Sequence, residues 1–256
     1  MHLQLNRELA LGYSSISQQV RVMTEAWVEH NLFCPQCGNL HLTGFENNRK
    51  VADFFCDKCG WEYELKSKNG PAKDKIVDGQ FDTMITRLNS LTNPNLFFLN
   101  YDKDFVVNDF LAIPKYFFTP EIIEKRKPLS STAKRAGWVG CNILFGQIPS
   151  VGVISIIKNK ELVSTDLVLA SWQKTQFLND AKTIDARGWT LDIFNIIIGL
   201  NKVDFNLDEI YKFELELSYK HPDNLHIRDK IRQQLQVLRD KQVLEFLGNG
   251  KYKILI

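Results

Sequence analysis

The apolar positions in the first two thirds of the chain alternate between helical and strand spacing. Residues 14–31, SSISQQVRVMTEAWVEHN, predict an amphipathic helix with Val20, Met23, Trp27 and Val28 on its apolar face. Strand-like runs rich in aromatic and β-branched residues come next, VADFF (51–55) and WEYELKS (61–67), with a bend between them. Further along, the pattern predicts a helix at 78–89, strands at 94–102 and 104–114, a hairpin at 150–164 and a helix at 167–178.

A polar stretch without periodicity, NDAKTIDARG (179–188), separates this part from a different pattern. Beyond it the sequence predicts three helices, at 190–200, 206–219 and 224–241, and then two strand-like runs around Gly248-Asn249-Gly250. Three helices followed by a β-ribbon are the element order of a winged helix-turn-helix. We therefore expect an α/β (α+β) domain over 1–182 and a winged-helix domain over 183–256.

The last of these helices has two distinct faces. Its buried stripe is predicted to be Ile227, Ile231, Leu235 and Leu238. The opposite face presents polar side chains, namely His226, Asp229, Gln233 and Gln236, with Arg228 and Arg232 on its flanks. Together with Lys251 and Lys253 on the wing, this surface suits major-groove reading with phosphate contacts. A solvated face in a protein-binding winged helix is the alternative.

The amino-acid composition narrows the class of protein only slightly. The chain has 256 residues, of which 44% are hydrophobic and 24% charged, as in globular proteins. Its formal net charge of +2 predicts no particular partner. The apolar run IFNIIIGL (193–200) is far below membrane-spanning length, and Arg7 and Glu8 interrupt the N-terminal apolar run. We therefore expect a protein of the reducing cytoplasm, without a membrane partner.

Four of the five cysteines form two CxxC pairs. These are Cys34 and Cys37, followed by Gly38, and Cys56 and Cys59, followed by Gly60. The repeated spacing predicts a four-thiolate zinc site, and the glycines suit two tight knuckles. Because four protein ligands complete the coordination of zinc, such a metal would be structural. Ordinary buried cysteines and a redox CxxC are the alternatives, and Cys141, which has no partner pair, is expected to be buried.

Charged residues lie on both sides of the second pair. On a strand, Glu64 and Lys66 point to the same face, and a hairpin with residues 51–55 would bring Asp53 toward them. Two carboxylates suit Mg²⁺, and an amine beside them suits phosphodiester hydrolysis, in which Lys66 would orient or deprotonate a water. Solvated surface charges are the alternative interpretation.

The arrangement of Asp53, Glu64 and Lys66 resembles the PD-(D/E)XK nuclease superfamily. The whole combination resembles the DpnI-type methyl-directed type II restriction endonucleases more narrowly. The stretches that carry this likeness run from the first helix to the C-terminal wing: MTEAWVEHNLFCPQCGN, FENNRKVADFFCDKCGWEYELKSKNG, RKPLSSTAKRAGWVGCNI and IRDKIRQQLQVLRDKQVLEF.

The resemblance implies a PD-(D/E)XK nuclease core joined to a winged helix, which cuts double-stranded DNA containing N6-methyladenine within GATC. It implies Asp53, Glu64 and Lys66 as catalytic residues, with Asp53 and Glu64 on magnesium and the four paired cysteines on zinc. We expect a monomer. Ala52 stands where the superfamily has proline. Since that proline only stiffens the approach to the aspartate, catalysis is hardly affected.

An N6-methyl group removes the donor that a Gln or Asn side chain would normally contact on adenine, so its reader needs an apolar or aromatic surface. The best candidate is Trp138 in RAGWVGCN, between Gly137 and Gly140 and close to Lys134 and Arg135. In an irregular basic segment this tryptophan would meet the methyl group or insert between bases. A core tryptophan is the alternative.

Two other functions fit part of the sequence. A zinc-knuckle and winged-helix regulator would bind DNA without cutting it, and its acidic residues would be incidental. A repair or nicking nuclease would use the same chemistry on a substrate defined by structure, and it would ignore methylation.

Overall fold

The computed structural model describes residues 1–46, 52–71 and 73–256. Val51, the first residue of one predicted strand, lies outside the described residues. The chain forms two compact units, Met1–Gln176 and Phe177–Ile256. Among the described residues, no helix is both long and apolar enough to span a membrane.

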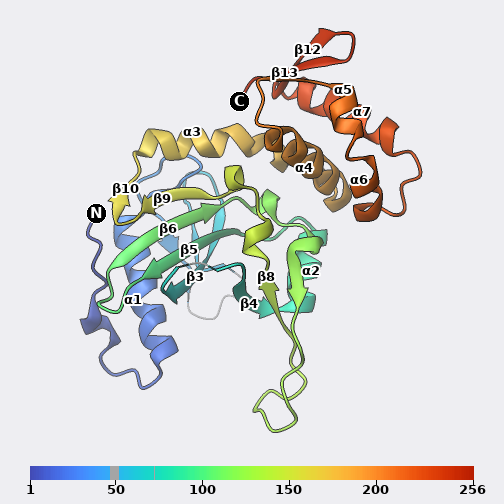
Figure 1. Cartoon of the computed structure of the whole chain (residues 1–256). Helices are drawn as coiled ribbons and strands as arrows, with labels where there is room; N and C mark the ends of the chain where they lie inside the picture. The colour runs from blue at the N-terminus through green and yellow to red at the C-terminus, as the bar shows by residue number, and fades with distance from the viewer. Residues whose placement is uncertain (47–51, 72) are drawn as a thin grey trace. The chain divides into compact units, whose positions relative to one another are not determined.

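A seven-stranded sheet forms the centre of the first unit, with the order β1-β2-β3-β5-β6-β9-β10 (Figure 1). Its strands β3 and β5 are parallel, whereas the other neighbouring pairs are antiparallel. The strands are β1 (Thr43–Gly44), β2 (Phe54–Phe55), β3 (Glu62–Asn69), β5 (Asn95–Tyr101), β6 (Val107–Ile113), β9 (Ile154–Lys158) and β10 (Glu161–Leu162). All residues of β5 are buried, as expected for a central strand covered on both faces.

The core of this unit packs two helices against the sheet. Helix α1 (Ile16–Asn31) contributes Met23, Trp27 and Val28, and α3 (Thr165–Thr175) contributes Val168 and Trp172. Trp27 contacts Phe110 of β6 with ring centroids 5.7 Å apart. The apolar face predicted for the first helix is therefore confirmed, although Val20 is only partly buried.

A second, three-stranded sheet has the order β4-β8-β7. Its strands are β4 (Ile76–Gln80), β7 (Ile123–Lys125) and β8 (Gly140–Ile143), and α2 (Phe81–Asn89) follows β4 directly. The sequence predicted a helix from residue 78, but residues 78–80 belong to β4, because the backbone at Ile76–Gln80 pairs with β8. Short 3-10 turns complete the described chain, at Arg7–Ala10, Lys115–Phe117, Pro120–Ile122, Phe145–Gln147, Ser150–Gly152 and Gln176–Asp180.

The second unit is a helix-turn-helix with a β-ribbon. Its helices are α4 (Ile184–Gly199), α5 (Leu207–Tyr211), α6 (Glu214–Lys220) and α7 (Ile227–Asp240). Strands β11 (Asp204–Asn206), β12 (Leu244–Gly248) and β13 (Lys251–Ile254) form a sheet of order β11-β13-β12. The glycine turn between the last two strands is as predicted, while β11 was not predicted.

Two helix boundaries in this unit differ from the sequence prediction. Helix α4 begins within the polar stretch 179–188, because the side chain of Thr183 accepts a hydrogen bond from the backbone N–H of Ala186 and caps the helix. The helix predicted over 206–219 is divided into α5 and α6, with Lys212 and Phe213 between them.

Candidate metal centre and active site

The two CxxC segments form matching knuckles. In each one the glycine after the second cysteine donates its backbone N–H to the carbonyl of the first cysteine, at 2.8 Å for both Gly38 and Gly60. Both glycines have positive φ, 75° and 73°. This backbone conformation is the reason why glycine follows each pair.

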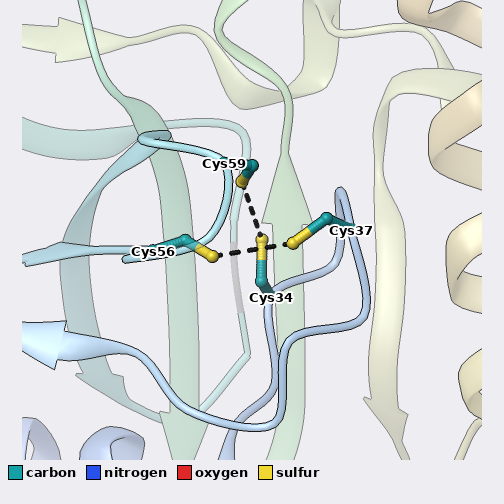
Figure 2. Close-up of side chains that lie close together, drawn as sticks. All are labelled: Cys34, Cys37, Cys56 and Cys59. Atoms are coloured by element: carbon teal, nitrogen blue, oxygen red, sulfur yellow. Dashed lines mark hydrogen bonds between the residues drawn. The ribbon is translucent and has the colours of Figure 1, made fainter.

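The four thiols of the knuckles converge on one point (Figure 2). Their Sγ atoms all lie within 4.8 Å of one another, and the Cys34–Cys59 and Cys37–Cys56 pairs are each 3.6 Å apart. Thiolates about 2.3 Å from a tetrahedral zinc lie about 3.8 Å from one another, so the cluster fits this metal. The arrangement therefore can hold zinc, as the spacing predicted.

Polar groups beside the thiols would orient them toward a metal. The side-chain amide of Asn39 donates to Cys56 Sγ at 3.6 Å, and Tyr63 Oη lies 3.0 Å from Cys34 Sγ. Burial raises the pKa of the Cys34 thiol to about 11, so this thiol is protonated at neutral pH when no cation is bound. Zinc binding would consequently release a proton here.

The second knuckle connects β2 to β3. These strands pair antiparallel, with Phe54 opposite Tyr63, and Asp53 continues the pairing through its N–H to the carbonyl of Tyr63 at 2.9 Å. The Asp53 carboxylate turns back and accepts the backbone N–H of Leu65 at 2.6 Å. The predicted hairpin with Cys56 and Cys59 at its bend is thus confirmed, and it places the Asp53 carboxylate at the backbone of Leu65, between Glu64 and Lys66 in the sequence.

Successive side chains of β3 point alternately into the hydrophobic core and toward the candidate active site. Tyr63 and Leu65 pack into the hydrophobic core, whereas Glu64 and Lys66 share the other face. Lys66 Nζ lies 2.5 Å from Glu64 Oε1 and 2.7 Å from Asp78 Oδ1. The Asp78 side chain is only 4% exposed, against 19% for Glu64 and 24% for Lys66. Asp78 is a site residue that the sequence reasoning did not identify.

Burial and charge shift the protonation of this cluster. Burial raises the pKa of Glu64 to about 7, the charges of Asp78 and Asp53 add to this effect, and Lys66 opposes it. Burial alone would lower the pKa of Lys66, but Glu64 and Asp78 outweigh it and raise the pKa above its usual range. Lys66 is therefore an ammonium ion at neutral pH, suited to holding anionic oxygen rather than taking a proton.

Asp53 also lines a recess of about 40 Å³. It is lined by three charged residues of α1, namely Arg21, Glu25 and Glu29, and by residues of the β1–β2 region. Arg21 pairs with Glu25 at 2.7 Å. Burial raises the pKa of Glu25, and the charge of Asp53 contributes to that rise. The surroundings of Asp53 thus disfavour further negative charge.

Trp138 belongs to the long loop between β7 and β8, which extends away from the sheets in the yellow-green part of the ribbon (Figure 1). Its side chain is partly exposed, so it is not a core residue. The Arg135 guanidinium lies 4.9 Å from the centre of the Trp138 ring, and both Lys134 and Arg135 are exposed. The loop therefore presents an aromatic surface among positive charges.

The predicted faces of the last helix agree with α7. Ile227, Ile231, Leu235 and Leu238 are buried. The polar candidates are exposed, namely His226, Arg228, Asp229, Arg232, Gln233 and Gln236, as is Lys251 of β13. Both arginines have partners within the unit: Arg228 pairs with Glu214 at 2.7 Å, and Arg232 contacts Asp229 and donates to Tyr211 Oη at 2.8 Å.

Residues 1–181 match the model of the DpnI family, described as the Dam-replacing family. Residues 185–254 match the Dam-replacing HTH domain. These matches imply a nuclease of the restriction class with a C-terminal helix-turn-helix domain, in agreement with the mixed α/β core and the four-thiol cluster. The chain belongs to the DpnI family of methyl-directed endonucleases, as its resemblance predicted.

Proposed function

We propose that the protein is a type II site-specific deoxyribonuclease that cuts double-stranded DNA at N6-adenine-methylated GATC sites and depends on Mg²⁺. The observation that carries the chemistry is the cluster at β3, where an ammonium group lies between carboxylates beside Asp53. Its setting in a DpnI-family chain favours phosphodiester hydrolysis. We infer a bacterial cytoplasmic enzyme that acts as a monomer.

Asp53 and Glu64 would hold Mg²⁺, which prefers oxygen ligands. The donor set fits, because the carboxylates of Glu64, Asp78 and Asp53 lie close enough to disfavour ionisation of Glu64, a cost that a divalent cation offsets. Bound there, the metal would polarise the scissile phosphate and make a water more acidic. Zinc in the cysteine cluster would have a structural role.

Lys66 would act as a fixed positive charge. Its ammonium is held by two carboxylates at 2.5 and 2.7 Å, so it is already oriented before the substrate arrives. In this position it would stabilise the negative charge that develops on the phosphate and orient the attacking water. The raised pKa favours this role over that of a general base.

Recognition would involve both units. In the first unit, Trp138 would contact the methyl groups, while Lys134 and Arg135 contact phosphate. In the second, the exposed face of α7 would enter the major groove with His226, Arg228, Arg232, Gln233 and Gln236, and Lys251 would contact the backbone. Arg228 and Arg232 would exchange their internal partners for DNA.

The first experiment is a digest of one plasmid prepared from adenine-methylating and non-methylating hosts, with Mg²⁺ and with an EDTA control. We expect discrete fragments from the methylated plasmid only. Equal cutting of both would retain the nuclease and remove methyl dependence. Binding without cutting would favour a regulator.

Two variants assign the roles. Lys66→Ala should abolish cutting while methyl-selective binding remains, as measured by fluorescence anisotropy on matched duplexes.

Trp138→Ala should reduce the preference for methylated DNA by about 10-fold, the range for one lost recognition contact. An unchanged preference would assign Trp138 a structural role instead.

A further inference from the structure

The carboxylate of Asp78 reaches the catalytic cluster from a different sheet. Lys66 is on β3 of the seven-stranded sheet, whereas Asp78 is on β4 of the three-stranded sheet. Their side chains meet at 2.7 Å, with Asp78 almost fully buried. An unpaired charge in such a place is strongly unfavourable, so each group fixes the position of the other.

Alternation along β4 accounts for the direction of Asp78, because Ile76 and Asp78 are buried whereas Val77 between them is exposed. Asp78 lies opposite Cys141 and Gln80 lies opposite Gly140, so the register shifts between Asp78 and Gln80. The irregularity therefore follows Asp78 and precedes α2, and bulges of this kind are common beside active sites. The shifted segment is further held by Cys141, whose thiol donates to the carbonyl of Gly79 at 3.5 Å.

The same strand pair leads to the loop that carries Trp138. Phe81 donates its backbone N–H to the carbonyl of Val139 at 3.1 Å. The indole of Trp138 lies so close to Gly140 that a Cβ there would be 2.8 Å from the ring. Asp78 and the Trp138 loop are therefore attached to one two-stranded unit, β4–β8.

Metal binding would change the environment of Lys66. Among the described residues, Lys66 forms ion pairs with the carboxylates of Glu64 and Asp78. If Mg²⁺ were held by Glu64, Asp78 would still hold the ammonium of Lys66 at 2.7 Å. We propose that Asp78 is a positioning residue for Lys66, fixing its ammonium from the strand that also supports the Trp138 loop. This inference rests on the proposed function of Lys66.

The test compares Asp78→Asn with Asp109→Asn, a matched control in the same unit. Asp109 is hydrogen-bonded as well, although less buried than Asp78, and its partners are the amide of Asn100 at 2.6 Å and the backbone N–H of Asn159. We expect Asp78→Asn to lower the single-turnover cleavage rate of methylated duplex about 100-fold, the effect of misplacing a catalytic group by about 1 Å. The Kd of that duplex, measured with Ca²⁺ in place of Mg²⁺, should remain within about twofold of the wild type.

Wild-type cleavage rate in Asp78→Asn, or an equal loss of rate and binding, would overturn the proposal. If the asparagine variant does not fold, Asp78→Glu provides the second comparison, because it keeps the charge and should cleave measurably. A folded glutamate variant as inactive as Lys66→Ala would contradict a positioning role.

A thermal measurement separates this inference from the proposed function. Asp78→Asn should lower Tm more in the wild-type background than in the Lys66→Met background. Only the wild-type background has an ammonium group at position 66 that loses its ion pair with Asp78. Equal decreases in Tm in the two backgrounds would mean that Asp78 and Lys66 do not interact. If wild-type protein does not cut methylated DNA, the nuclease proposal fails, and the Tm comparison still decides whether Asp78 holds Lys66.

Discussion

The β2–β3 hairpin carries two clusters with opposite constructions. The thiols of Cys56 and Cys59 at its bend meet those of Cys34 and Cys37 from a matching knuckle, and in both knuckles a glycine closes the same backbone hydrogen bond. Beside its paired strands, unlike charges face one another, and one carboxylate comes from a second sheet. The first cluster suits a closed metal site that stabilises the fold, and the second keeps oxygen atoms available for a substrate-binding cation.

This difference separates stability from activity. A cluster that requires a metal to complete it should unfold when a ligand is lost. A variant of the cluster that crowds three carboxylates around one ammonium should instead lose function while the fold persists, because active sites retain locally unfavourable arrangements. Variants at each cluster can test this division.

The largest expected effect is at the thiols. Replacing Cys56 with serine should release zinc and unfold the first unit, because zinc in such sites contributes on the order of 10 kcal/mol. Zinc content by atomic emission and unfolding by circular dichroism would measure this effect. Cys141→Ala is the control, since Cys141 lies outside the cluster, and it should retain zinc. A folded, zinc-free Cys56→Ser protein would remove the structural role.

The second-largest expected effect is on the cleavage rate, without a loss of stability. Glu64→Gln should slow cleavage at least about 100-fold, as for other losses of transition-state charge stabilisation. Its Tm should be unchanged or higher. The substitution removes a buried negative charge near Asp78 and Asp53, while the ion pair between Lys66 and Asp78 remains. Single-turnover cleavage and calorimetry provide both numbers, with the exposed Glu161→Gln as control. A large loss of Tm would mean that this cluster, too, is primarily structural.

The smallest effect concerns the hydrogen bonds around the thiols. Asn39→Ala removes a donor to Cys56 Sγ and should weaken zinc binding by about 10-fold without unfolding the protein. Competition with a chromogenic chelator would measure the affinity. Asn69→Ala, at the exposed end of β3, is the control and should bind zinc as the wild type does. If the two variants bind zinc equally, Asn39 does not tune the metal centre.

Features set by short sequence spacing could be predicted from the sequence. The two knuckles, the shared face of Glu64 and Lys66 and the buried stripe of α7 each follow from spacing within a few residues. Asp78 could not be found in this way, because its contact with Lys66 joins two sheets whose relative placement no short spacing reveals. An apolar pattern that resembled a helix from residue 78 concealed the strand. Similarly, the start of α4 depends on a single capping side chain, Thr183.

The loop between β7 and β8 has a consequence for how such an enzyme can diversify. It is attached at both ends to the three-stranded sheet, while the β2–β3 hairpin belongs to the seven-stranded one. Residues within it can therefore be exchanged without altering the register of β2 and β3. Gly140 is the restricted position, because any side chain there meets the indole of Trp138. We expect selection for a new modified base to change this loop first, and to leave Gly140 in place for as long as Trp138 remains.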